Sequence, residues 1–186
     1  MKKLIIAAGL ITALALAAFG TTGGLPVSFA GTWTLDKAKS QGLDQRMQNA
    51  ESVTCVITQD DNTISVEWKI AGGQPPAAGA APSGGGGGGG GMGRGPSGPR
   101  VFNLDGKEVT SEGPMSSTNA AKATWSDATK TLELSTVSTG SRDGQEFKIT
   151  RVDKLSLSAD GKVLTVNRHS ESPRGAQDST LVFNKQ

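Results

Sequence analysis

Apolar and polar residues alternate with a period of two along most of this chain, and the alternation is most regular between Thr63 and Ile70. One face of this segment carries only apolar side chains, namely Ile64, Val66, Trp68 and Ile70. Successive side chains of an extended strand point to opposite faces of a sheet. The pattern therefore predicts a strand with one buried face and one solvated face.

An earlier segment with the same period places Trp33 on its apolar face, together with Phe29, Gly31 and Leu35. Further period-two segments follow at 52–58, 101–104, 108–111, 119–125, 132–136, 147–157, 164–168 and 181–185. Short strands joined by tight turns predict an all-β, antiparallel up-and-down barrel of about 8–10 strands, because closure removes the exposed edges of such a sheet. A two-sheet sandwich is the alternative, which the simple order of the strands disfavours.

Two connections are predicted in more detail. The polar stretch from Asp36 to Ala50 interrupts the period and is expected to form one or two helical turns. Asp105-Gly106-Lys107 is typical of a tight hairpin turn, because Asp-Gly adopts positive φ at low cost. We therefore expect the segments on its two sides, 101–104 and 108–111, to pair with each other.

The first residues have the features of an export signal. Lys2 and Lys3 precede an apolar run from Leu4 to Phe19, which is shorter than the roughly 20 residues of a transmembrane helix and ends in small residues. We predict a signal peptide over residues 1–20, with a second cleavage site near residue 30 as the alternative. The barrel domain is predicted over residues 27–186, exported to the periplasm or the extracellular medium, with no stable membrane span after signal removal.

The composition changes abruptly between Ala71 and Arg100, where 14 of the 26 glycines and five of the eight prolines lie. Such a segment has almost no apolar surface to bury, so burial cannot offset the entropy of ordering it. We predict a flexible, disordered loop over 71–100 that interrupts the barrel domain. Because loop-closure entropy grows slowly with length, we also expect that removing residues 72–99 leaves the barrel folded.

Charge and reactive residues exclude several classes of function. Without Lys2 and Lys3, 17 basic residues face 17 acidic ones, so no nucleic-acid partner is expected. The single cysteine, Cys55, lies between apolar positions and is predicted to be a buried, inert thiol. The single histidine, His169, lies on the outward parity of its strand and is predicted to be a surface residue. With so few ligating and nucleophilic groups, the sequence predicts no metal site, no cofactor and no enzymatic activity.

Three charged residues, Arg151, Asp153 and Arg168, share the parity of apolar positions and face the barrel interior if their strands are regular. A buried charge is costly unless it is paired. Either Arg151 and Asp153 pair with each other, or an arginine binds an anionic group of a ligand. A β-bulge between Ile149 and Leu155 that turns both side chains outward is the favoured alternative.

The motif Phe29-x-Gly31-x-Trp33 resembles the Gly-x-Trp signature that opens the first strand of lipocalins and fatty-acid-binding proteins, the calycin group. The chain resembles most closely a family of secreted bacterial lipocalin-like proteins of unknown function. This closer resemblance is carried by Gly31-Thr-Trp33-Thr-Leu-Asp36, Lys39-Ser40, Leu155-Ser-Leu-Ser158, Asp160-Gly-Lys162, Leu164-Thr-Val166, Arg168-His169 and Leu181-Val-Phe183. In calycins the tryptophan packs across the barrel floor beneath a late Arg or Lys. The resemblance therefore implies a floor of Gly31 and Trp33 with Lys185, or alternatively Arg168, stacked on the indole.

Two hypotheses for the function follow. In the first, the barrel binds a small hydrophobic or amphipathic anionic ligand, with Trp68, Arg151 and Arg168 in the binding site. The resemblance supports this hypothesis, since fatty-acid carriers of the calycin group use interior arginines in this way. In the second, the protein is a non-enzymatic structural or interaction protein of the envelope, with a barrel filled by its own side chains. Its protein partners are not identified by the sequence.

Overall fold

A computed structural model describes residues 25–72, 98–113, 117–142 and 144–186. These residues form ten strands and one short helix: β1 (Gly31–Leu35), α1 (Gln45–Asn49), β2 (Ser52–Gln59), β3 (Thr63–Ala71), β4 (Arg100–Asn103), β5 (Val109–Gly113), β6 (Ser117–Ser126), β7 (Thr131–Arg142), β8 (Gln145–Leu157), β9 (Val163–Ser172) and β10 (Gly175–Lys185). The predicted all-β class and the predicted number of strands are confirmed.

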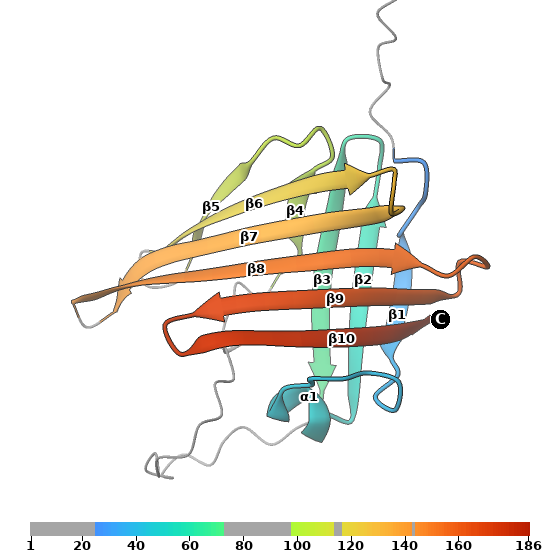
Figure 1. The fold of residues 1–186 in the computed structure, drawn as a ribbon, viewed down its shortest axis with the longest axis horizontal. Helices are drawn as coiled ribbons and strands as arrows, with labels where there is room; N and C mark the ends of the chain where they lie inside the picture. Colours follow the sequence, from blue (N-terminus) through green and yellow to red (C-terminus); the bar gives the residue numbers. More distant parts are fainter. Residues whose placement is uncertain (1–24, 73–97, 114–116, 143) are drawn as a thin grey trace, which may run out of the picture.

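All ten strands belong to one antiparallel sheet in the order β4-β3-β2-β1-β10-β9-β8-β7-β6-β5. Every neighbouring pair is consecutive in sequence except β1 and β10, which join the two ends of the chain. The long strands β6 to β10 cross in front of β1 to β4 in Figure 1. The sheet thus curls into a nearly closed up-and-down barrel, and its seam lies between β4 and β5.

The predicted hairpin across Asp105-Gly106-Lys107 is wrong. β4 pairs only with β3, and β5 pairs only with β6. The turn itself is present, with Gly106 at φ 77°. It separates the two strands at the seam because each of them finds its hydrogen-bond partner on the opposite side.

The predicted helical turn between Asp36 and Ala50 is confirmed as α1. Its N-cap is Asp44, whose Oδ1 accepts a hydrogen bond of 2.7 Å from the Met47 backbone N–H. Two other predictions, the signal peptide over residues 1–20 and the flexibility of the glycine-rich loop, concern residues that lie wholly or mostly outside the described ranges.

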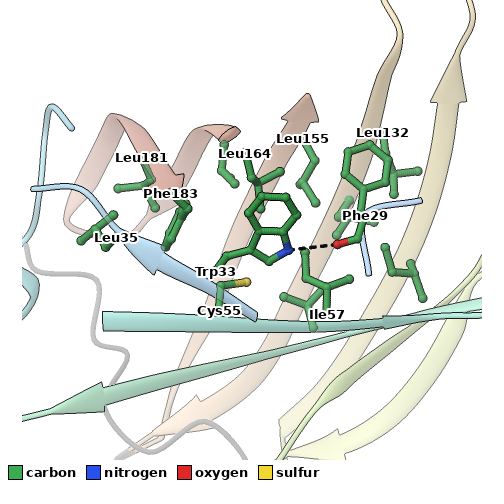
Figure 2. Packing of buried hydrophobic residues seen from close by; sticks show 14 of the residues in the cluster. Phe29, Trp33, Leu35, Cys55, Ile57, Leu132, Leu155, Leu164, Leu181 and Phe183 are labelled. Carbon is green, nitrogen blue, oxygen red and sulfur yellow. Dashed lines mark hydrogen bonds between the residues drawn. The ribbon is translucent and has the colours of Figure 1, made fainter. Parts of the chain in front are cut away.

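Trp33 occupies the centre of the apolar core and is fully buried. Its indole Nε1 donates a 3.0 Å hydrogen bond to the Phe29 carbonyl, as Figure 2 shows. A buried indole N–H needs such a partner, because an unpaired buried donor is costly. The surrounding apolar side chains come from both layers of the barrel, and they include Leu35, Cys55, Ile57, Leu132, Leu155, Leu164, Leu181 and Phe183.

Gly31 has a φ of 147°, a backbone conformation that favours glycine. A Cβ atom there would lie 3.1 Å from Cε of Lys185. Nζ of Lys185 lies 5.3 Å from the centroid of the Trp33 ring, within the range of a cation–π contact. The three residues that the resemblance assigns to the barrel floor are therefore in contact with one another.

The inward face of β7, β8 and β9 changes from apolar to polar partway along each strand. In one half the inward positions are Leu132, Leu134, Leu155, Leu164 and Val166, and in the other half they are Thr136, Arg151, Asp153, Arg168 and Ser170. Because these positions face one another across the ladder, this layer of the barrel has an apolar half beside Trp33 and a polar half beyond it. The polar half is where chemistry or recognition can occur.

The register of β3 and β4 sets the length of any replacement for the glycine-rich segment. Arg100 lies opposite Val66, while β3 continues to Ala71, so a connection has to run back along five residues, about 17 Å. Direct removal of residues 72–99 cannot bridge this distance, because consecutive Cα atoms are about 3.8 Å apart, so the expectation of an intact fold needs a linker. A Gly/Ser linker of about eight residues in place of 72–99 can span the distance.

We expect this shortened protein to fold cooperatively, with a gain of about 1 kcal/mol at most from the shorter loop. Thermal unfolding followed by circular dichroism tests the expectation. Loss of a cooperative transition would show that the glycine-rich segment is needed for the fold.

Candidate functional site

A buried ion pair between Arg168 and Asp153 lies at the start of the polar half. Arg168 Nε donates to Asp153 Oδ1 at 2.7 Å, and Nη2 donates to Oδ2 at 2.9 Å. The two side chains face each other because Asp153 on β8 is the register partner of Arg168 on β9. Burial acts to lower the pKa of Arg168, but the charge and hydrogen bonds of Asp153 outweigh it and raise the pKa.

Trp68 covers the same guanidinium. The Arg168 Cζ atom lies 4.7 Å from the centroid of the Trp68 ring, and this ring packs edge-on against Phe183. Arg168 therefore stacks on Trp68, and the alternative that it stacks on Trp33 is wrong. The reason is the position of Lys185, which is opposite Trp33 in the β1–β10 register and covers that indole itself.

The β-bulge favoured by the sequence, which would turn Arg151 outward, is not present. The register between β7 and β8 is continuous from Leu155 to Gln145, so no β-bulge turns Arg151 and Asp153 outward. Asp153 forms its hydrogen bonds with Arg168, so the predicted pairing of Arg151 with Asp153 is also wrong. Both oxygens of Asp153 bind the Arg168 guanidinium, and no hydrogen bond or ion pair joins Asp153 to Arg151 among the described residues.

Arg151 is left without a comparable partner. Among the residues that the structure describes, the buried Nε of Arg151 has no hydrogen-bond partner. Burial and the nearby charge of Arg168 lower the pKa of Arg151 to about 10, although Asp153 acts in the opposite direction. At neutral pH the side chain is still a cation, and no ion pair within the described part of the chain neutralises its charge.

The segment that contains α1 covers this part of the barrel. Gln41 forms a β-bridge with Thr180 on β10, and the Met47 side chain is buried. Figure 1 shows α1 where β2 begins and β3 ends, next to β10. Beneath the segment lies a cavity of ≈ 30 Å³, which has room for about one or two water-sized groups. Its lining consists of Gly42, Asp44, Met47, Arg151, Arg168, Ser170, Gln177 and Ser179.

Two charged residues of this region were not recognised from the sequence. Arg100 begins β4 on the same inward parity as the buried Phe102, and its charge interacts with Asp153 and Arg168. Asp44 lines the cavity, and its charge reaches both Arg151 and Arg168. The alternation Arg100-x-Phe102 was the available signal for Arg100, whereas nothing in the sequence places Asp44 near β8 and β9.

A larger, open groove of ≈ 480 Å³ lies mainly on the outer face of β8, β9 and β10. His169 lies there, exposed, with Nδ1 2.7 Å from Asp178 Oδ1 and Nε2 3.4 Å from Glu171 Oε1. Hydrogen bonds to Asp178 and then Glu171 raise the pKa of His169. This groove has satisfied, solvated charges, so we place the candidate site in the interior instead.

Cys55 is buried between Val53 and Ile57, as predicted, and burial raises the pKa of its thiol to about 12. The thiolate is therefore absent at neutral pH, which makes the residue inert as a nucleophile.

Across the described ranges, no group of three or more His, Cys, Asp or Glu side chains is placed to hold a metal ion. None of the helices in those ranges is long and apolar enough to cross a bilayer.

Comparisons with protein-family models, with curated proteins and with solved structures found no match to this chain. The fold and the site therefore define its class by themselves. The protein is a nearly closed, antiparallel ten-stranded β-barrel whose interior is apolar around Trp33 and cationic around Arg151 and Arg168.

Proposed function

We propose that the protein is an exported, lipocalin-like carrier that binds a small amphipathic molecule with an anionic group. One observation carries the proposal, namely the buried Nε atom of the half-buried Arg151 side chain, which lacks a hydrogen-bond partner among the described residues. Such a cation is costly in the free protein and becomes favourable when an anion is placed against it. The ligand's anionic group would bind Arg151, while Trp68 and Arg168 would form the adjacent wall.

The proposal requires the segment around α1 to move, because the cavity of ≈ 30 Å³ is smaller than an amphipathic molecule. A five-residue helix is marginal on its own, so its position depends on packing and on its cap. Met47 lies in the cavity wall and supplies the apolar contact that a ligand chain would replace. Asp44 supplies a negative charge close to the arginines, which the ligand's own anionic group would replace.

Arg151→Met tests this function, with 1-anilinonaphthalene-8-sulfonate as an amphipathic anionic probe. We expect saturable binding by the unmodified protein and a loss of roughly tenfold to a hundredfold in the variant, since charge-assisted hydrogen bonds contribute about 1.5–3 kcal/mol. We also expect the melting temperature to stay the same or to rise, because the variant removes an unpaired buried charge. Fluorescence titration and thermal unfolding give the two readouts.

Two further variants complete this experiment. Lys148→Met removes an exposed positive charge from the same strand and should leave binding unchanged. Asp44→Asn keeps an efficient helix cap but removes the negative charge beside the arginines, so it should tighten binding. A variant Arg151→Met that binds the probe like the unmodified protein, or one that loses stability, would contradict the assignment.

A second function is favoured by the small cavity and the close-packed apolar half around Trp33. In this alternative the barrel is filled by its own side chains, and the protein acts in the envelope as a structural or interaction protein. The alternative predicts no saturable binding of the probe by the unmodified protein. The same titration therefore separates the two functions.

A further inference from the structure

Arg100 brings a third guanidinium to the site. It begins β4 and shares the inward parity of Phe102, which is 3 % exposed. The register places Arg100 opposite Val66 on β3. Val66 is two residues before Trp68, so these two side chains lie on the same face of β3. Trp68 in turn stacks on Arg168. The strand that carries Arg100, β4, belongs to the back layer of the barrel, and the strands that carry Arg151 and Arg168, β8 and β9, belong to the front layer.

The electrostatic effects on the arginine pKa values agree with this arrangement. Burial lowers the pKa of Arg100, with Asp153 opposing this effect and Arg168 adding to it. The charge of Arg100 likewise contributes to lowering the pKa of Arg151. Like charges interact in this way only when they are close or poorly screened, as they are inside a barrel.

The charges in this environment do not balance. Among the residues that the structure describes, three guanidinium groups face one interior carboxylate, Asp153, which is already bound by Arg168. Asp44 offsets part of the surplus, but it belongs to the segment that has to move when a ligand binds. With that segment displaced, the site carries an excess of about two positive charges.

We propose that the anionic group of the ligand is a phosphate monoester, a dianion, bound jointly by Arg100 and Arg151 next to the Arg168–Asp153 pair. This inference rests on the proposed function and specifies its ligand class. A carboxylate has one charge and two oxygens, which a single guanidinium satisfies through two parallel hydrogen bonds. A phosphate monoester has a charge of about −1.5 to −2 at pH 7 and three terminal oxygens, which match two free guanidinium groups.

Displacement of the anilinonaphthalene probe from the full chain tests the inference, with octyl phosphate, octyl sulfate, octanoate and inorganic phosphate as competitors below micelle formation. Octyl sulfate has the shape of the phosphate but only one charge. We expect octyl phosphate to bind roughly tenfold more tightly than octyl sulfate or octanoate at about pH 7.5. Inorganic phosphate should compete far more weakly than octyl phosphate, because it has no apolar chain.

The pH dependence provides a second readout. The second pKa of a phosphate monoester is about 6, so its advantage over octyl sulfate should fall to within about threefold at about pH 5. The charged groups that face the site are Arg151 and Asp153 on β8, Arg168 on β9, Arg100 on β4 and Asp44 before α1. Octyl sulfate measured at both pH values corrects for any titration of these groups, and for His169 on the outer face.

The variant Arg100→Met tests whether Arg100 binds the phosphate group. We expect this variant to lose roughly tenfold in affinity for octyl phosphate and to keep its affinity for octanoate within about twofold.

Equal binding of octyl phosphate, octyl sulfate and octanoate would overturn the inference and leave the proposed function intact. An Arg100→Met variant that keeps the preference for phosphate would overturn the role of Arg100. If inorganic phosphate competes as well as octyl phosphate, the prediction that the ligand has an apolar chain is wrong. If no competitor displaces the probe, the proposed function itself fails.

Discussion

Replacing Trp33 with alanine is expected to lower the free energy of unfolding by roughly 3–5 kcal/mol, the range found when a large core aromatic side chain is removed. The indole is fully buried at the centre of the apolar half and contacts side chains from both layers of the barrel. The variant also leaves the Phe29 carbonyl without the indole donor and Lys185 without the aromatic face beneath it. These losses add to the cost of the cavity.

Urea unfolding of both proteins, followed by far-ultraviolet circular dichroism, measures this difference. Trp125→Ala is the matched control, because Trp125 is only partly buried and its indole donates to the exposed Asp127 at the barrel rim. We expect the control to lose clearly less stability than Trp33→Ala. An unchanged unfolding midpoint for Trp33→Ala would show that Trp33 does not hold the barrel floor together.

Asp153→Asn has the second large effect that the structure predicts. The substitution leaves the Arg168 guanidinium buried, with only 8 % of its side chain exposed, next to a neutral amide. Breaking a buried ion pair from one side costs about 3–5 kcal/mol, mostly because the remaining charge has no counter-ion. Removing both charges, as in Asp153→Asn with Arg168→Met, should therefore recover much of the lost stability.

An exposed ion pair one register position away serves as the control. Lys154 on β8 and Glu133 on β7 are 3.6 Å apart and solvated, so Glu133→Gln should change stability by less than about 1 kcal/mol. Equilibrium unfolding of four variants, Asp153→Asn, Arg168→Met, the double variant and Glu133→Gln, gives all the values needed. An Asp153→Asn variant as stable as the unmodified protein, or a double variant less stable than both singles, would contradict the role of the pair.

Much of the fold was predictable because the signal is local. Strands such as β3 carry an unbroken alternation of apolar and polar residues, and the side-chain period of a strand is two whatever the tertiary structure. The pairing of β4 and β5 was not predictable in this way. An Asp-Gly turn is equally compatible with strands that pair and with strands that separate at a seam, and the choice depends on β3 and β6, which are distant in sequence.

The site was predictable only in part. The inward parity of Arg151 and Arg168 could be read from the alternation. The pairing of Asp153 with Arg168 depends on the exact register of β8 and β9, whose midpoint lies between Asp160 and Gly161, and the turn sequence does not fix that register. The stacking of Arg168 on Trp68 was not accessible, because it depends on how β3 and β9 face each other across the barrel. The same holds for Arg100, which a long glycine-rich segment separates from β3.

Native mass spectrometry tests the central claim, that the barrel binds an amphipathic anion through Arg151, most directly. The unmodified protein and the Arg151→Met variant would each be purified gently from the host and incubated with a host lipid extract. We predict a discrete adduct on the unmodified protein that is lost on collisional activation and is depleted in Arg151→Met. A clean mass without adduct for both proteins, before and after incubation, would contradict the claim and favour a barrel filled by its own side chains.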